Sequence, residues 1–238
     1  MTVATATQEG KPPMTDSPAQ PLVLFHTPGA CSRVAMNALE ELGLPFEDRP
    51  IDIFTGAQRR PEYLAVNPKG KVPALLVGKA LLTETPAIVA WLIAEHPDAG
   101  LMPGGDSLER AQAFADLVWC SNTLHPLVRA IRMPQLMTTG DPEPVRDAAI
   151  AQMTLNLETM EQRFAQAPWW FGERWSILDV YLAWITGMCA GANVEMGAHA
   201  AVMGHMARVR ERPGFQRALA REQQALDSAG IVLPGGRL

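Results

Sequence analysis

The spacing of apolar and polar positions changes along the chain and separates two halves. In residues 22–97, short apolar runs alternate with segments of helical spacing. The predicted strands are Leu22–Phe25, Phe46–Ile53, Val72–Val77 and Ala80–Thr83, and the predicted helices are Ser32–Leu42, Gln58–Val66 and Thr85–Glu95. We expect a right-handed parallel crossover between the first two strands and a hairpin between the last two. This order, βαβ, helix, β-hairpin, helix, is typical of a small α/β sandwich.

The second half shows helical periodicity and no convincing strand. Helices are predicted over Ser107–Arg132, Pro144–Gln166, Ile177–Ala190, Ala200–Arg210 and Gly214–Ser228. The pair Ser176 and Asp179 fits a capping box at the start of the third of these helices. The expected organisation is a tail at 1–20, an α/β domain at 21–97, a Gly/Pro-rich linker at 98–106, an all-helical domain at 107–230 and a tail at 231–238.

Composition excludes several classes of protein. The 238 residues carry a net charge of -5 without a basic stripe, which argues against nucleic-acid binding. No apolar run is long enough to span a membrane. Cys31, Cys120 and Cys189 are far apart and lack metal-ligand spacing, so we expect neither disulfides nor a metal site, and a reducing, cytoplasmic location. The first 20 residues lack the apolar region of a signal peptide and are typical of a disordered tail.

Cys31 lies where the first strand gives way to a helix. Thr27-Pro28-Gly29 interrupts the strand pattern, and helical spacing begins at Ser32. Free N–H groups and the helix dipole at this position would lower the pKa of a thiol and favour the reactive thiolate. A buried structural cysteine explains the position equally well.

Two more features of the first half suit the binding of a small peptide. At Val72-Pro73 a cis bond would turn the chain into a strand and leave the backbone of Val72 free to pair with an extended ligand. At Glu84-Thr85-Pro86, Thr85 is expected to cap a helix that begins with Pro86. The helix end would offer N–H groups to a carboxylate, and Glu84 would offer a negative charge to an ammonium group.

In this order and spacing, these features resemble the glutathione-binding domain of the cytosolic glutathione S-transferases. The resemblance covers nearly all of residues 22–230 and implies an N-terminal thioredoxin-like domain followed by a C-terminal helical bundle. Pro28-Gly29-Ala30-Cys31-Ser32 is similar to the bacterial beta class, whose active-site residue is a cysteine, and Leu124-His125 matches a pair found in that class. Three positions depart from the class: His26 stands where a tyrosine is common, Pro126 where a lysine is common, and Thr85 where a serine is usual.

The resemblance implies a role for each candidate residue. Val72 would pair with the cysteinyl part of glutathione, and Glu84 and Thr85 would hold its γ-glutamyl group. Cys31 and Ser32 would face the sulfur, with His125 as electrostatic partner or proton relay. The full predicted glutathione-binding set is Cys31, Ser32, Lys71, Val72, Pro73, Glu84, Thr85, Asn122 and His125, with Cys31, His125 and Ser32 catalytic.

The helix around His125 offers separate support. The residues expected to face the core are Phe114, Leu117, Ser121, Leu124, Val128 and Ile131. Beside them Asn122, His125, Arg129 and Arg132 form a polar stripe, which suits either the wall of a cleft or an ordinary solvated edge.

The expected function is a glutathione transferase that conjugates glutathione to small hydrophobic electrophiles. Val34 stands three residues after Cys31, so a dithiol cycle is ruled out, and thiol transfer through a mixed disulfide is the expected companion activity. Two alternatives remain open: a glutathione-dependent lyase or isomerase of an aromatic substrate, and a non-catalytic ligand-binding homologue. The resemblance also implies a homodimer, with Arg110–Val118 and Thr85–Trp91 as candidate contacts; no metal, nucleic-acid or membrane partner is expected.

Overall fold

The computed structural model describes residues 20–233, so nearly all of the two predicted tails lies outside the described residues. A four-stranded mixed sheet has the order β2-β1-β3-β4. Its strands are β1 (Leu22–His26), β2 (Glu47–Pro50), β3 (Ala74–Val77) and β4 (Ala80–Thr83). The parallel pairing of β1 with β2 and the β3–β4 hairpin are confirmed. Strands β2 and β3 are shorter than predicted.

Three helices complete this half: α1 (Ser32–Glu41), α2 (Pro61–Leu64) and α3 (Thr85–Glu95). The predicted helix over 58–66 is wrong at its beginning, where 3-10 turns at Ile53–Thr55 and Ala57–Arg59 lead into the short α2. Helix α1 packs against α3, α7 and α9. As a result nearly all of α1 is buried, including its polar residues Arg33, Asn37 and Glu40.

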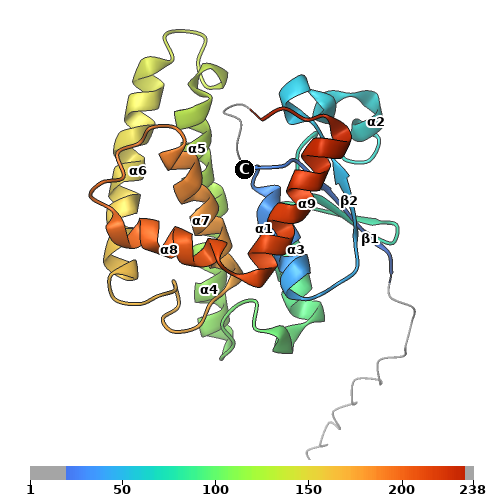
Figure 1. The fold of residues 1–238 in the computed structure, drawn as a ribbon, viewed down its shortest axis with the longest axis horizontal. Helices are drawn as coiled ribbons and strands as arrows, with labels where there is room; N and C mark the ends of the chain where they lie inside the picture. The colour runs from blue at the N-terminus through green and yellow to red at the C-terminus, as the bar shows by residue number, and fades with distance from the viewer. Residues whose placement is uncertain (1–19, 234–238) are drawn as a thin grey trace, which may run out of the picture.

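The second half of the described chain is helical. It contains α4 (Ser107–Trp119), a π-helical turn (Cys120–Leu124), α5 (His125–Arg132), α6 (Glu143–Phe164), α7 (Ile177–Ala190), α8 (Ala200–Arg210) and α9 (Pro213–Ala229). The predicted helices are confirmed to within a few residues at most ends. Helix α9 crosses back and lies along α1 (Figure 1), so the last helix also covers the first half. The division of the chain at 98–106 stays a prediction.

Ion pairs fix α9 against the first half. The Arg33 guanidinium donates to the fully buried Glu222 through Nε at 2.9 Å. Glu40 accepts from Arg217, also at 2.9 Å, and from Arg221. These contacts supply partners for charged side chains that α1 buries, and burial without partners would cost several kcal/mol, on the order of 3–5.

The predicted capping box is confirmed for the hydrogen bond that the Asp179 side chain accepts from the backbone N–H of Ser176. Asp179 is fully buried, and its Oδ2 accepts from the backbone N–H of Ser176 at 2.8 Å and from the Ser176 hydroxyl at 3.0 Å. Its Oδ1 accepts from the backbone N–H of Trp170 at 2.8 Å and lies 2.9 Å from Nε2 of His205. One carboxylate thus joins the start of α7 to the preceding loop and to α8.

The predicted core face of the helix before His125 is partly wrong. Phe114 is 38% exposed, and Cys120, which was given no role, is fully buried instead. The π-helical turn explains the difference, because it inserts an extra residue into the helical repeat. Leu124 and the following apolar positions of α5 are buried as predicted.

No helix among residues 20–233 has the length and apolar character needed to cross a membrane.

Candidate functional site

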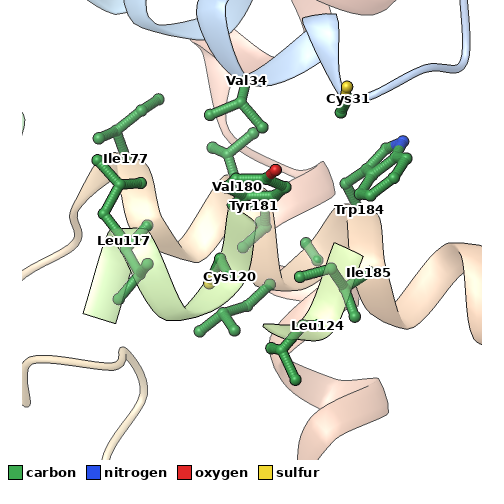
Figure 2. Packing of buried hydrophobic residues seen from close by; sticks show 14 of the residues in the cluster. Cys31, Val34, Leu117, Cys120, Leu124, Ile177, Val180, Tyr181, Trp184 and Ile185 are labelled. Carbon is green, nitrogen blue, oxygen red and sulfur yellow. The ribbon is translucent and has the colours of Figure 1, made fainter. Parts of the chain in front are cut away.

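Cys31 lies at the N-terminal end of α1, after the turn that follows β1. Its side chain is 8% exposed, and its Sγ lies 3.8 Å from the carbonyl oxygen of Val72. Figure 2 shows Cys31 at the end of α1 that faces Trp184 of α7. Two features that are 41 positions apart in the sequence therefore meet at the sulfur.

Burial raises the pKa of the Cys31 thiol to about 12. The backbone N–H groups of Cys31 and Ser32 and the charge of Lys71 lower it, and the charge of Glu84 raises it further. Of the two alternatives left open by the sequence, the raised pKa favours the buried thiol over the thiolate in the protein without a ligand. Both sequence interpretations hold in part, since the residue is at a helix start and is buried, but loss of hydration has the larger effect.

Ser32 is engaged within the turn. Its fully buried hydroxyl donates to the carbonyl of Thr27 and accepts from the N–H of Thr27, both at 3.1 Å. The hydrogen bonds of Ser32 therefore stabilise the conformation of the turn, and they give no support to a contact with the glutathione sulfur.

The loop before β3 presents the backbone of Val72. The Val72-Pro73 bond is cis, as predicted. The carbonyl of Lys71 is held by the Tyr63 hydroxyl at 2.6 Å and by the Asn67 side-chain amide at 2.8 Å. Among residues 20–233 the N–H of Val72 has no hydrogen-bond acceptor. This donor is free for an extended ligand.

Helix α3 has the predicted range Thr85–Glu95, but its cap residue differs from the expected one. Glu84, not Thr85, occupies the cap position, and Thr85 is the first helical residue. Glu84 has a φ of 70°, in a left-handed region that favours glycine, and such strain persists where the surrounding structure imposes it. No side chain among residues 20–233 caps the helix, so its first N–H groups remain available to an anion.

Lys69, which has no role in the predicted set, contacts Glu84 at the site. Its Nζ lies 3.2 Å from Oε1 of Glu84 and donates to the hydroxyl of Thr83 at 2.9 Å. The only signal for it was its place two residues before Lys71 in the same loop. The pair is solvent-exposed, so its contribution to stability is small, about 0–1 kcal/mol.

His125 follows directly after the π-helical turn. Its Nδ1 lies 2.9 Å from the hydroxyl of Tyr181, and its ring packs edge-on against Trp184 with the ring centroids 4.7 Å apart. Burial lowers the pKa of His125 to about 4, with further lowering from the charges of Arg129 and Lys71. The imidazole is therefore neutral at neutral pH.

Tyr181 and Trp184 were not predicted as site residues. Both project from α7 toward the end of α1 (Figure 2), and the indole Nε1 of Trp184 donates to the carbonyl of Gly29 at 3.0 Å. Their spacing on an almost wholly apolar helix is typical of core residues, so the sequence held no signal of a role. Burial raises the pKa of Tyr181, and the charges of Cys31, Cys120 and Glu84 raise it further, which keeps the phenol protonated.

The structure brings part of the predicted set together. The charges of Glu84 and Lys71 shift the pKa of Cys31, and the charge of Lys71 also shifts the pKa of His125. Of the polar stripe, His125 alone is half-buried; Asn122, Arg129 and Arg132 are exposed.

A cavity of about 470 Å³ lies elsewhere, between the 100–104 segment, α4 and the loop before α7, and none of the predicted site residues lines it. Within 20–233, no cluster of histidine, cysteine and carboxylate side chains could hold a metal ion.

A four-stranded sheet with helices, an exposed backbone edge beside a cis-proline and a cysteine at the first helix define a thioredoxin-like protein with a helical second half. Residues 29–95 match the family model described as "Glutathione S-transferase, N-terminal domain". The chain is 30% identical to the glutathione S-transferase GstA of Escherichia coli, over 84% of this chain and 98% of that protein. The chain therefore belongs to the glutathione S-transferase family.

Other comparisons agree. A maleylacetoacetate isomerase of Pseudomonas aeruginosa is 37% identical over 61% of this chain and 70% of that protein. The structure of a sphingomonad glutathione S-transferase complexed with glutathione superposes with a TM-score of 0.75 at 31% identity, covering 84% of this chain and 98% of that one. A ternary complex of BphK, a bacterial glutathione transferase, has the same TM-score of 0.75 at 30% identity, covering 84% of this chain and 99% of that one.

Proposed function

We propose that this chain is an enzyme that binds glutathione at the Cys31 site and transfers it to small hydrophobic electrophiles. The observation that carries the proposal is the meeting of Cys31 with the Val72 backbone, whose N–H has no partner in the described chain. A backbone edge of this kind binds an extended peptide by strand addition. The family membership supports the same conclusion.

The polar groups around Cys31 match the two ends of glutathione. The backbone of Val72 would pair with the cysteinyl residue of the ligand. The uncapped N–H groups of α3 and the hydroxyl of Thr85 would take the γ-glutamyl carboxylate, and Glu84 would take its ammonium group. Lys69 already neutralises part of the Glu84 charge. Lys71 and Pro73 flank Val72, while Asn122, exposed on the π-helical turn, completes the proposed set.

For conjugation, the glutathione sulfur forms a bond to the electrophilic carbon, the leaving group departs with its electron pair, and the thiol proton passes to solvent. N–H groups at the start of α1 and the side chain of His125 would stabilise the developing thiolate. His125, with a pKa of about 4, is too weak a base to hold that proton at neutral pH, so we assign it a hydrogen-bonding role.

For thiol transfer, Cys31 would exchange with a glutathione-containing disulfide. The Cys31 sulfur forms a bond to the glutathione sulfur, the substrate thiol leaves, and the proton of Cys31 passes to it. A second glutathione then attacks the mixed disulfide, which releases oxidised glutathione and restores the Cys31 thiol. The raised pKa of Cys31 makes the first step slow unless the bound ligand changes its surroundings.

Turnover by Cys31→Ser and Cys31→Ala tests the two activities separately. We expect both variants to lose thiol transfer and to retain glutathione binding, with a smaller loss of conjugation. Cys189→Ala, which removes another buried thiol, is the matched control and should keep both activities. Unchanged thiol transfer in Cys31→Ala would refute the role of Cys31.

The identity to a maleylacetoacetate isomerase favours one alternative, a glutathione-dependent isomerase. In that reaction the glutathione sulfur would add to a carbon–carbon double bond, rotation would follow, and the sulfur would leave again. Isomerisation of maleylacetoacetate that requires glutathione would support this alternative. Glutathione binding with neither conjugation nor isomerisation would favour a non-catalytic binding protein.

We also propose a cytoplasmic homodimer. Helix α4 exposes Phe114 and Val118 on one face, within the predicted contact Arg110–Val118, and Thr85–Trp91 of α3 would form the other contact. Phe114→Glu should shift the mass measured by light scattering from dimer to monomer. A wild-type monomer at all concentrations would refute the dimer.

A further inference from the structure

A buried hydroxyl and a half-buried imidazole face each other beside the candidate site. The Oη of Tyr181 lies 2.9 Å from Nδ1 of His125, and Tyr181 is 1% exposed. Within residues 20–233, His125 is the only hydrogen-bond partner of this hydroxyl. Because the phenol keeps its proton, the Tyr181 hydroxyl has one hydrogen that needs an acceptor.

The position of that hydrogen decides the tautomer of His125. If Nδ1 carried a proton, it would donate to Oη, and the phenol hydrogen would have no acceptor in the described chain. A buried donor without a partner costs about 1–3 kcal/mol. If Nδ1 is unprotonated, it accepts from the phenol, and the buried phenol hydrogen has its partner, while Nε2–H stays free for a ligand. The neutral imidazole then carries its proton on Nε2.

The surroundings keep the imidazole in this neutral form. The positive charges that act on it come from Arg129 on its own helix and from Lys71 on the loop before β3. Trp184 and Tyr181 cover it from α7. The negative charge of Glu84 acts on Tyr181, and no carboxylate is among the groups that shift the pKa of His125.

We propose that Tyr181 is a positioning residue that holds His125 in the Nε2–H tautomer, so that this N–H donates a hydrogen bond to the sulfur of bound glutathione. The inference rests on the proposed function and adds a named donor to it. The proton stays on Nε2 throughout, and the hydrogen bond strengthens as negative charge develops on the sulfur.

Nitrogen-15 NMR of the histidine rings measures the tautomer of His125 in the protein without a ligand. The signal of His125 is assigned by its loss in His125→Asn. We expect wild type to show the Nε2–H form, and Tyr181→Phe to show a mixture with the Nδ1–H form. Tyr63→Phe is the matched control, because it also removes a buried tyrosine hydroxyl but one that bonds to the Lys71 carbonyl; it should leave the tautomer unchanged. A wild-type Nδ1–H form, or an unchanged tautomer in Tyr181→Phe, would overturn the inference.

Kinetics test the consequence for the reaction. We expect Tyr181→Phe to lower kcat for conjugation about 10-fold while KM for glutathione changes less than about 2-fold, because the donor acts on the charge that develops in the transition state. A changed tautomer with an unchanged kcat would also overturn the inference. Failure of the proposed function gives a different result, since wild type itself would then neither bind nor turn over glutathione.

Discussion

The indole Nε1–H of Trp184 donates to the carbonyl of Gly29 at 3.0 Å and joins α7 to the turn that precedes Cys31. The two residues are 155 positions apart, so the bond connects the two halves of the chain at the site. The His125 ring packs against the same indole in an edge-to-face arrangement. One tryptophan therefore positions both the cysteine turn and the histidine.

Trp184→Phe tests this connection. The variant keeps most of the apolar contact but loses the hydrogen bond to Gly29, so we expect the free energy of unfolding to fall by about 1–2 kcal/mol. The rate of conjugation should fall by more than the loss of folded protein explains, because the turn before Cys31 loses a hydrogen bond that fixes its position. Urea unfolding and conjugation kinetics measure the two effects. Wild-type turnover in Trp184→Phe would show that the bond has no part in the site.

The thiol of Cys31 should be unreactive in the protein without glutathione. With a pKa of about 12, its thiolate fraction at neutral pH is far below that of an ordinary cysteine. We expect alkylation by iodoacetamide, followed by peptide mass spectrometry, to be at least ~100-fold slower than for a free cysteine peptide. Glu84→Gln should speed the reaction, because the charge of Glu84 raises the pKa of Cys31.

Alkylation of Cys31 in wild type as fast as that of the free peptide would contradict the effect of burial. It would instead favour the activated thiolate that the helix position alone suggests.

Stability should depend on pH through His125. Its pKa is about 4 in the folded protein against 6.5 for an unperturbed histidine, so the unfolded chain binds an extra proton between these two pH values. The free energy of unfolding should therefore rise with pH from about 4 to 6.5, and the contribution of roughly 3 kcal/mol is lost as the pH falls through that range. His125→Asn should show a flatter slope in urea unfolding series. An equal slope in both proteins would contradict the lowered pKa.

Asp179 should be among the most sensitive positions for folding. Asp179→Ala leaves the buried N–H groups of Ser176 and Trp170 without an acceptor, so we expect a loss of about 3–5 kcal/mol in the free energy of unfolding. Asp98→Ala, at an exposed carboxylate, is the control and should stay within about 0.5 kcal/mol of wild type. A small loss in Asp179→Ala would show that the neighbouring groups find other partners.

The elements of this fold were largely predictable from the sequence because their signals are local. Apolar runs indicated the strands and the hairpin between the last two, and the pair Ser176 and Asp179 indicated the start of α7. The residue Phe114 was misplaced because a π-helical turn, which shifts the helical repeat, has no signature in apolar spacing.

The state of the site was less predictable than its location. Cys31 and Val72 were recognised, but the depth at which Cys31 is buried depends on α7, a helix about 150 residues later. The contact of Tyr181 with His125 could not be predicted for the same reason. An aromatic residue on an apolar helix indicates core packing whether or not its hydroxyl contacts a histidine. Periodicity reveals which face of an element is buried, and not which polar atom from elsewhere meets it.

Calorimetric titration with reduced glutathione tests the central claim most directly. Wild type should bind near cellular glutathione concentrations, and Glu84→Gln should bind at least ~10-fold more weakly, because the ammonium group of the ligand loses its charged partner. Glu95→Gln, an exposed glutamate at the other end of the same helix, should bind like wild type. Absence of binding by wild type, or equal binding by Glu84→Gln, would contradict the glutathione site described above.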